Sequence, residues 1–470
     1  MTRSPVTGVP PVGSGPIFTP PTVDGFHGIW YGYTDGTYYA GGLGTFPQQI
    51  HPMAHHAAGA GRTFFVWGGA RPGQPGKLLT TISYFDHATG RVVRPRILNE
   101  RYTNDGHDTP SLLVDPAGHI YVFSNAHGTL RDAFIYRSTR PYEIDEFETV
   151  LALDKACNFS YAQPWFIAGE GILLLHSFYG RTDPIRRLYL NSSRDGRQWD
   201  YRWELEGPGA RPAFALIPGG SYQVSQAHGP IVGTMFDYNV DAAGRTNLYY
   251  VQTADFGRTW QTADGTAVAL PFTQVRNPAL IRDYESERLF VFMKEIAFDA
   301  RGQPVLLYLT TPTEANDTTT PRQWRTAHYQ AATRQWVLRD AFVSDNNYDH
   351  GTFAIEADGT WRVIAPTAPG PQPGRTGGDM ELWTSRDEGD TWQRRARLTH
   401  GGRYNHTYAR RPLHAHDDFY AFWADGDVQG ESESALYFTD RFGTAVWRLP
   451  AKMRGTTARP KPVLGPILFP

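Results

Sequence analysis

A short turn sequence recurs along the chain and constrains the fold more than any other feature. Three copies are SSRDGRQW (192–199), TADFGRTW (253–260) and SRDEGDTW (385–392), and a weaker copy, TTTPRQW, ends at Trp324. They share the pattern Ser/Thr-x-Asp-x-Gly-x-Thr-Trp, the first copy being a residue short. Asp and Gly shape a tight hairpin, and Trp packs between strands. The repeated turn therefore indicates architecture and not chemistry.

The spacing of the repeats predicts the fold class. Trp199, Trp260, Trp324 and Trp392 are separated by 61, 64 and 68 residues, and each interval holds strand-like runs such as RLFVFMKEIA. A period of about 60 residues with four strands per unit is typical of β-propeller blades. About 430 residues at about 62 per blade predict an all-β, seven-bladed β-propeller, with these tryptophans on the outer parts of successive blades.

The ends of the chain suggest how the ring closes. Residues 418–450 supply strands for the final blade, and GFHGIWYGY (25–33) is well placed to complete that blade. The last residues, 451–470, are rich in Pro and Gly and are predicted to be extended. We therefore predict an extended segment over 1–24, one propeller domain over 25–450 and an extended tail over 451–470.

Composition excludes several classes of function. The 45 Lys and Arg nearly balance the 47 Asp and Glu, so we expect neither nucleic acid nor a membrane as a partner. The single cysteine, Cys157, excludes an intramolecular disulfide framework and a cysteine-rich zinc site. The start, MTRSPVTGVPPVGSGPIFTPP, has no apolar signal-peptide region, which predicts a cytoplasmic protein, or a secreted one if a leader has been removed. We also expect a monomer.

Two histidines stand out at the ends of neighbouring predicted strands. His107 lies in NDGHDTPSLLVD (104–115) and His127 lies twenty positions later in VFSNAHGTL (122–130). Both have small neighbours, Gly106, Ala126 and Gly128, which leave room for a ligand. Packing, a metal site that also uses Asp105 and Asp108, and acid–base catalysis are all consistent with this pattern.

Other polar groups at predicted strand ends could share a pocket with this pair, because the loops at one end of a propeller converge on its axis. Those that we single out are His51, Tyr161, His176, Arg181, Arg187 and Arg245. The chain has no nucleophile elbow, Walker loop or dinucleotide fingerprint. No cofactor is required by these residues.

Several stretches together resemble one family of propellers. They are YYAGGLGTFPQQIHPMAHH, NDGHDTPSLLVDPAGHIYVFSNAHG, SYAQP, LLLHSFYGR, RTNLYYVQTADFGRTW and HTYARRPLHAHDDFYAFWADGD. The family is that of seven-bladed propellers with bacterial-neuraminidase-type repeats, which includes ulvan lyases and L-rhamnosyl-α-1,4-D-glucuronate lyases. The resemblance spans roughly residues 25–450, and the paired-histidine stretch is its most specific part.

This resemblance implies an acidic glycan as the substrate, cleaved by β-elimination between rhamnose and C4 of glucuronate. Such a reaction needs a base for the C5 proton, an acid for the leaving oxygen and a cation for the carboxylate. The family pattern assigns catalysis to His107, His127 and Tyr161, the tyrosine donating a proton, or acting on both sides if nearby cations lower its pKa. Substrate binding is expected from Arg181, Arg187, Arg245, His51 and His176.

The resemblance leaves alternatives open. Some relatives are hydrolases of the same linkage and use a histidine on the opposite face, to which His51 corresponds. Some members hold a calcium ion near the axis, although the sequence does not identify its ligands here. A sialidase is less favoured, because no arginine triad with a Tyr–Glu pair can be placed. A non-catalytic carbohydrate-binding propeller is disfavoured by the histidine pair.

Overall fold

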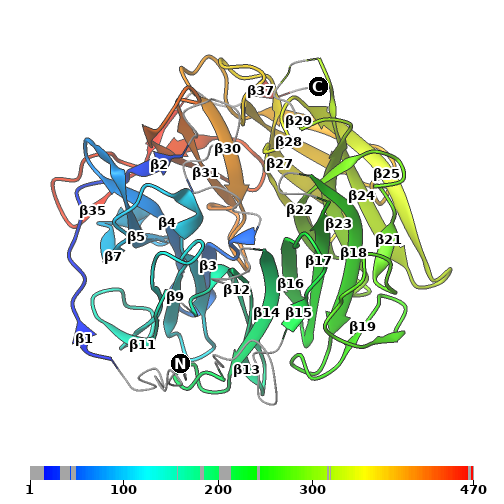
Figure 1. The fold of residues 1–470 in the computed structure, drawn as a ribbon. Helices are drawn as coiled ribbons and strands as arrows, with labels where there is room; N and C mark the ends of the chain where they lie inside the picture. The colour runs from blue at the N-terminus through cyan, green and yellow to red at the C-terminus, as the bar shows by residue number, and fades with distance from the viewer. Residues whose placement is uncertain are drawn as a thin grey trace, which may run out of the picture.

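The computed structural model describes residues 15–31, 43, 49–155, 157–179, 185–200, 213–240, 244–314, 317, 319–463 and 467–468. The regular elements within these ranges are strands, with short 3-10 helices such as η2 (Ala58–Ala60) and η3 (Gly106–Asp108). Among the described residues, no helix is both long and apolar enough to cross a membrane. The fold is an all-β propeller (Figure 1).

The described strands form seven hydrogen-bonded sheets, numbered here in chain order. Sheet 1 contains β3 (Ala54–Ala57), β4 (Arg62–Arg71), β5 (Gln74–Asp86), β6 (Arg91–Val93) and β7 (Arg96–Glu100); sheet 2 contains β8 (Ser111–Val114), β9 (Ile120–Ser124), β10 (Ala133–Ser138) and β11 (Phe147–Leu153); sheet 3 contains β12 (Ser160–Ile167), β13 (Gly171–Tyr179), β14 (Arg186–Ser193) and β15 (Ala213–Ala215); sheet 4 contains β16 (Gln223–His228), β17 (Ile231–Asn239), β18 (Arg245–Thr253), β19 (Trp260–Gln261), β20 (Ala267–Val268) and β21 (Leu280–Arg282). Sheet 5 contains β22 (Phe290–Phe298), β23 (Pro304–Thr311), β24 (Arg322–Gln330) and β25 (Gln335–Ser344); sheet 6 contains β26 (Thr352–Ile355), β27 (Trp361–Ala368), β28 (Asp379–Ser385) and β29 (Gln393–Arg397); sheet 7 contains β30 (Asn405–Arg410), β31 (Ala421–Gly426), β33 (Leu436–Thr439) and β34 (Val446–Arg448).

The first strand of each sheet faces the axis. These inner strands contact one another in chain order, from β3 and β8 through β12, β16, β22 and β26 to β30. The ring closes where Leu413, just after β30, hydrogen-bonds through its backbone to Ala54 and His56 of β3. The bridge between Leu413 and His55 is parallel, so the closing strands run in the same direction along the axis. Residues that precede inner strands gather at one end, the entry end, and residues that follow them gather at the exit end.

The two termini brace the ring. β2 (Gly28–Trp30) pairs with β32 (Ser432–Ser434) and meets β4 at Gly28. The prediction that residues 25–33 complete the final blade is therefore wrong in detail: β2 bridges sheet 1 to the connection between β31 and β33. The outer edge of sheet 7 is already paired, because β34 takes β36 (Lys461–Pro462) as its neighbour.

Further short strands run along the outer edges of other sheets. β1 (Ile17–Phe18) pairs with β11, β35 (Thr457–Ala458) with β6 and β37 (Ile467–Leu468) with β29. The residues after 450 thus pair in turn with sheets 1, 7 and 6. These edge pairings satisfy backbone groups that an open outer strand would expose.

The repeated turn has the structural role that its composition predicts. In each full copy the aspartate carboxylate accepts a backbone hydrogen bond from the residue before the tryptophan, as in Thr259 N to Asp255 at 2.9 Å and Thr391 N to Asp387 at 2.9 Å. Trp199 packs edge-on against Phe123 of the preceding sheet at 5.8 Å. The turn therefore fixes a hairpin and supplies an aromatic anchor between sheets.

Candidate active site

Two imidazoles and a phenol converge at the entry end of the axis. His107 lies on η3 before β8, His127 follows β9, and Tyr161 is at the start of β12. The two imidazole rings stack with centroids 4.1 Å apart and planes inclined by 12°. The ring of Tyr161 lies 6.0 Å from each of them. The structure therefore brings together the three residues to which the sequence analysis assigns catalysis.

Asp105 orients both imidazoles. Its carboxylate lies 2.5 Å from Nδ1 of His107 and 3.0 Å from Nδ1 of His127, and it also caps η3 by accepting the His107 backbone N–H. When a carboxylate accepts Nδ1–H, the neutral ring carries its lone pair on Nε2. Both rings are thus held in the tautomer that can accept a proton through Nε2.

Further charged side chains surround Asp105 and hold it in place. Arg131 donates to Asp105 at 3.0 Å and to Asp108 at 2.6 Å, and Arg101 also donates to Asp108. Asp108 in turn accepts the His127 backbone N–H at 2.8 Å. This network connects the loop before β8 to the loop after β9, so the spacing of the two histidines is fixed by buried ion pairs.

The environment keeps His107 neutral at neutral pH. Burial and the neighbouring imidazole of His127 lower the pKa of His107 to about 4, although Asp105 opposes this shift. The His107 side chain is 4% exposed, whereas that of His127 is 28% exposed. A neutral imidazole beside a solvent-reachable one is suited to accept a proton from a bound substrate.

Tyr161 has an unusual backbone and a protonated side chain. Its φ is 55°, and it occupies a register shift between Ser160 and Gln163 in the pairing of β12 with β13. Left-handed backbone at a non-glycine residue costs energy and is common at functional sites. Burial and the nearby Tyr179 and Tyr222 raise the pKa of Tyr161 well above its usual value. Tyr161 is therefore suited to donate a proton, and the alternative in which cations lower its pKa does not fit.

Tyr179 connects the phenol to the imidazoles, and sequence reasoning missed it. Its hydroxyl lies 3.3 Å from Nε2 of His127 and 3.5 Å from the Tyr161 hydroxyl. Arg186 donates to the same hydroxyl at 3.3 Å. The chain His127–Tyr179–Tyr161 offers a route along which a proton can move between the base side and the acid side of the site.

Arg186, the neighbour of the predicted Arg187, is the arginine that enters the site. The guanidinium of Arg186 lies 3.1 Å from the ring centroid of Tyr222, and its hydrogen bonds go to the Ser221 carbonyl, the Tyr179 hydroxyl and the Asn239 amide oxygen. These partners are neutral, so its charge is available to an anionic ligand. Arg187 instead donates to the carbonyl oxygen of Leu216 at 2.7 Å.

Of the other two predicted arginines, Arg245 lies near the site and Arg181 is not described. Arg245 lies 4.5 Å from the Tyr222 ring centroid and donates to the Tyr348 hydroxyl at 3.3 Å, so it extends the basic region that Arg186 begins. Arg181 lies outside the described residues. Asp237 accepts the Tyr222 backbone N–H, and although burial raises its pKa to about 6, it is still mostly ionised at pH 7 and balances part of the charge of the two arginines.

The structure places His176 and His51 away from this cluster. His176 is fully buried within sheet 3, where Nε2 contacts Asn191 at 2.7 Å and Nδ1 contacts the Ser177 carbonyl. The predicted substrate-binding role of His176 is therefore replaced by a packing role. His51 is buried near the axis against Trp165, at 5.3 Å between centroids, and burial holds its pKa well below the usual value.

Metal binding at the histidine pair competes with the ion pairs already present. One ligand atom each of Asp105, His107 and His127 lie within 4.8 Å of one another, which would suit a metal. The Arg131 guanidinium, however, already contacts the Asp105 carboxylate and supplies positive charge there. Calcium prefers oxygen ligands, and this set is mainly imidazole, so it does not fit the calcium ion that the resemblance implies.

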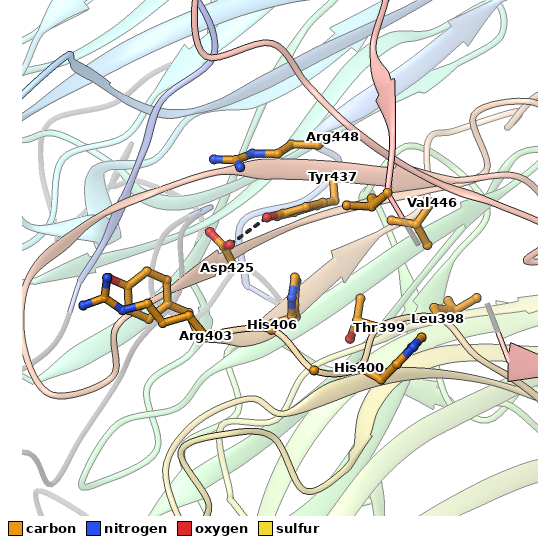
Figure 2. A pocket seen from close by; sticks show the side chains of 13 residues that line it. Leu398, Thr399, His400, Arg403, His406, Asp425, Tyr437, Val446 and Arg448 are labelled. Atoms are coloured by element: carbon orange, nitrogen blue, oxygen red, sulfur yellow. Dashed lines mark hydrogen bonds between the residues drawn. The ribbon is translucent and has the colours of Figure 1, made fainter. Parts of the chain in front are cut away.

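Cavities also lie away from this cluster in the described part of the chain. One of about 350 Å³ lies between sheets 6 and 7 and is lined by Arg403, His406, Asp425, Tyr437 and Arg448, among others (Figure 2). A larger one of about 640 Å³ is at the exit end, where His55, His56, Trp165 and His414 contribute to its walls. Neither includes a residue of the histidine pair.

Comparisons with known proteins agree with this fold. A model of the BNR repeat-containing family matches residues 80–365, and no curated protein sequence matches the chain. The chain is similar to the structure of a PL25 ulvan lyase bound to -[GlcA(1-4)Rha3S]-, with a TM-score of 0.66 and 16% identity over 90% of this chain and 96% of that chain. It is also similar to polysaccharide lyase Uly1, with a TM-score of 0.59 and 11% identity over 90% of this chain and all (100%) of that chain. Because the repeat model covers more than half of its length, the chain belongs to the BNR repeat-containing family.

Proposed function

We propose that the protein is a polysaccharide lyase that cleaves the L-rhamnose-α-1,4-D-glucuronate linkage by β-elimination, leaving a 4,5-unsaturated glucuronate. The observation that carries this proposal is the stacked pair His107–His127, oriented by one carboxylate of Asp105 beside the phenol of Tyr161. The fold, which is similar to that of an ulvan lyase bound to a glucuronate–rhamnose saccharide, supports this class of substrate.

In the proposed reaction, Arg186 binds the glucuronate carboxylate and stabilises the additional negative charge that develops on it as C5 loses its proton. His107 takes the C5 proton, the C–H electrons form the C4–C5 double bond, and the C4–O bond breaks. Tyr161 gives its proton to the departing rhamnose oxygen. After the product leaves, His107 releases the C5 proton to solvent, and Tyr161 regains a proton from solvent through the more exposed His127 and Tyr179, which resets the site.

A glycoside hydrolase is the main alternative. The large exit-end cavity favours it, because Trp165 contributes to that cavity and also packs against His51. Hydrolysis there would need an activated water and a carboxylate or imidazole that faces it. The entry-end cluster has the base, acid and cation that elimination needs, and this favours the lyase. A non-catalytic sugar-binding propeller would not need two imidazoles held by one carboxylate.

Incubation with gum arabic and with ulvan tests the proposal. A lyase is expected to generate an ultraviolet-absorbing product, because the C4–C5 double bond is conjugated with the carboxylate. The absorbance should rise with time in the presence of the protein and stay flat with protein that has been heat-inactivated. Release of saccharides without any rise in absorbance would favour the hydrolase.

The pH dependence of the reaction tests the environment of His107. Because its pKa is lowered to about 4, His107 stays unprotonated down to that pH and loses its function as a base below it. We expect the acidic limb of the kcat/KM profile to lie near pH 4, and not near the usual imidazole value of about 6.5. Steady-state rates from about pH 3.5 to 8, with folding checked by circular dichroism at each pH, measure it. An acidic limb near 6.5 would point to a more exposed histidine as the base.

We also propose that the ring has seven blades. The seven hydrogen-bonded sheets and the consecutive contacts of their first strands support this number. A crystal structure is expected to show seven radial blades, with Trp199, Trp260, Trp324 and Trp392 in four consecutive ones. A ring of six or eight blades would contradict the repeat length inferred from these tryptophans.

A further inference from the structure

Five histidines gather at the exit end, where the ring closes, and the lyase mechanism uses none of them. His55 and His56 come from β3, His87 from the turn after β5, and His414 and His416 from the connection between β30 and β31. Their rings lie close together: 5.3 Å between the centroids of His55 and His414, 4.9 Å for His56 and His87, 5.1 Å for His56 and His416, and 4.0 Å for His87 and His416.

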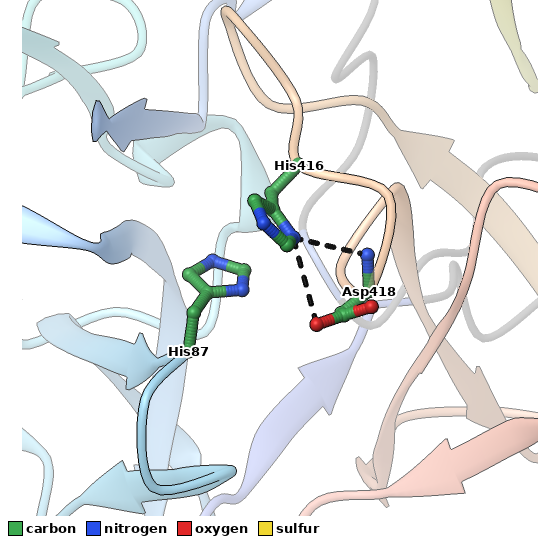
Figure 3. Close-up of side chains that lie close together, drawn as sticks. All are labelled: His87, His416 and Asp418. Carbon is green, nitrogen blue, oxygen red and sulfur yellow. Dashed lines mark hydrogen bonds and ion pairs between the residues drawn. The ribbon is translucent and has the colours of Figure 1, made fainter.

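Three side chains in this cluster are arranged as metal ligands. His87, His416 and Asp418 each offer one ligand atom, and these atoms lie within 4.8 Å of one another. Figure 3 shows the rings of His87 and His416 next to each other, with the Asp418 carboxylate to the right of both and joined to His416 by a dashed line. Nδ1 of His416 lies 3.6 Å from an Asp418 carboxylate oxygen.

One of these ligands is already oriented and has an unused nitrogen. Nε2 of His87 lies 2.8 Å from the Thr63 hydroxyl, which also lies 3.3 Å from Nδ1 of His56. Nδ1 of His87 is buried and has no hydrogen-bond partner among the described residues. A buried imidazole nitrogen without a partner is costly unless something binds it. The Thr63 contact resembles the outer hydrogen bonds that orient metal-bound histidines in proteins.

The cluster is open to ions from solution, since the side chains of His416 and Asp418 are 39% and 63% exposed.

We propose that His87, His416 and Asp418 bind one divalent transition-metal ion of the Zn²⁺ class, with the His56 imidazole beside the site. Two imidazoles and a carboxylate are ligands that Zn²⁺ takes in tetrahedral sites, whereas calcium and magnesium prefer oxygen alone. His87 belongs to sheet 1, and the other two ligands belong to the segment that leads into β31 of sheet 7. The ion therefore fastens the last sheet to the first, next to the closing hydrogen bonds of Leu413.

A ligand that binds only the folded ring stabilises it by mass action, so the ion should raise the melting temperature. The experiment uses full-length protein that has been treated with a chelator and dialysed, titrated with zinc chloride by calorimetry. We expect one tightly bound Zn²⁺ at this site and a melting temperature that rises with zinc. X-ray absorption at the zinc edge should show nitrogen and oxygen ligands at about 2.0–2.1 Å.

Matched variants locate the ion. His416→Ala and Asp418→Asn alter an exposed segment, so they should fold, and each is expected to weaken this binding by at least about tenfold and to remove most of the thermal shift. His228→Ala, which alters an exposed histidine in another sheet, should bind zinc as the wild type does. His107→Ala tests the other histidine group and should also leave this site intact.

Three results would overturn the proposal. One is zinc binding of unchanged stoichiometry and affinity in both His416→Ala and Asp418→Asn, and another is wild-type protein that binds no zinc at micromolar concentrations. Loss of binding only in His107→Ala would place the ion at the entry end and would equally contradict it. None of these readouts depends on lyase activity, so a failure of the metal-site proposal can be distinguished from a failure of the proposed function.

Discussion

Replacing His107 by alanine is expected to lower kcat for cleavage of a rhamnose–glucuronate substrate by at least about a hundredfold, the usual effect of losing a general base. The physical reason is that His107 is the neutral, buried imidazole that Asp105 holds with Nε2 as the proton acceptor. Initial rates from the rise in ultraviolet absorbance measure this effect, at a pH where the wild type is most active.

Stability must be measured on the same variant, because His107 is also buried in an ion-pair network. Loss of a buried hydrogen-bonding group typically costs about 1–3 kcal/mol. His176→Ala is the matched control, since His176 is a buried histidine with two hydrogen bonds that lies outside the cluster. We expect His176→Ala to lower the melting temperature and keep its activity at low temperature. If His107→Ala behaves in the same way, and Tyr161→Phe is fully active, the catalytic assignment is wrong.

Replacing Arg186 by alanine is expected to lower kcat/KM by about a hundredfold to a thousandfold, comparable with the loss of one group that stabilises developing charge. The arginine binds the carboxylate in the substrate and binds it more strongly as the C5 proton leaves, so kcat should fall as well as the affinity. Arg186→Lys should recover only part of the activity, because an ammonium group lacks the bidentate geometry of the guanidinium.

Arg187 provides a control one residue away. Its guanidinium donates to the Leu216 carbonyl, and its position in β14 pairs with Phe178, whereas that of Arg186 pairs with Tyr179. Arg187→Ala is expected to change the melting temperature more than kcat. Equal losses of kcat/KM in the Arg186→Ala and Arg187→Ala variants would show that the substrate carboxylate is not bound where we place it.

The contrast between these two arginines shows what the sequence could and could not predict. Neighbouring residues on a strand point to opposite faces, so only one of the pair can share a face with Tyr179. The pairing of Tyr179 with Arg186 and of Phe178 with Arg187 decides which one it is. That register depends on the residues after β13, and no local motif in the sequence specifies it.

The histidine pair was predictable for a related reason. His107 and His127 flank a single hairpin, β8–β9, and a hairpin brings its two ends together whatever the rest of the fold does. Asp105, which orients both rings, could have been found from its position two residues before His107 in a capping role. Tyr179 and His176 both lie on strand β13, and the sequence alone cannot tell which of them reaches the entry end of the ring.

The fold class was predictable from the repeated turn, because its Asp and Trp form the same kind of hairpin in several sheets. The closure of the ring was not predictable from that repeat. It depends on contacts between residues more than 350 positions apart, such as Leu413 with Ala54, together with the short pairs β2 with β32 and β6 with β35. These short strands have no periodic signal, since each consists of two or three residues.

The measurement that tests the central claim most directly is cleavage in water enriched in oxygen-18, followed by mass spectrometry of both new chain ends. Elimination breaks the bond between C4 and oxygen without adding water. We therefore predict an unsaturated glucuronate that is lighter than the hydrated sugar by one water and carries no label from the cleavage step. A saturated glucuronate, with one oxygen-18 incorporated into the released rhamnose for each bond cleaved, would contradict the account and would direct attention to His51 and the exit-end cavity.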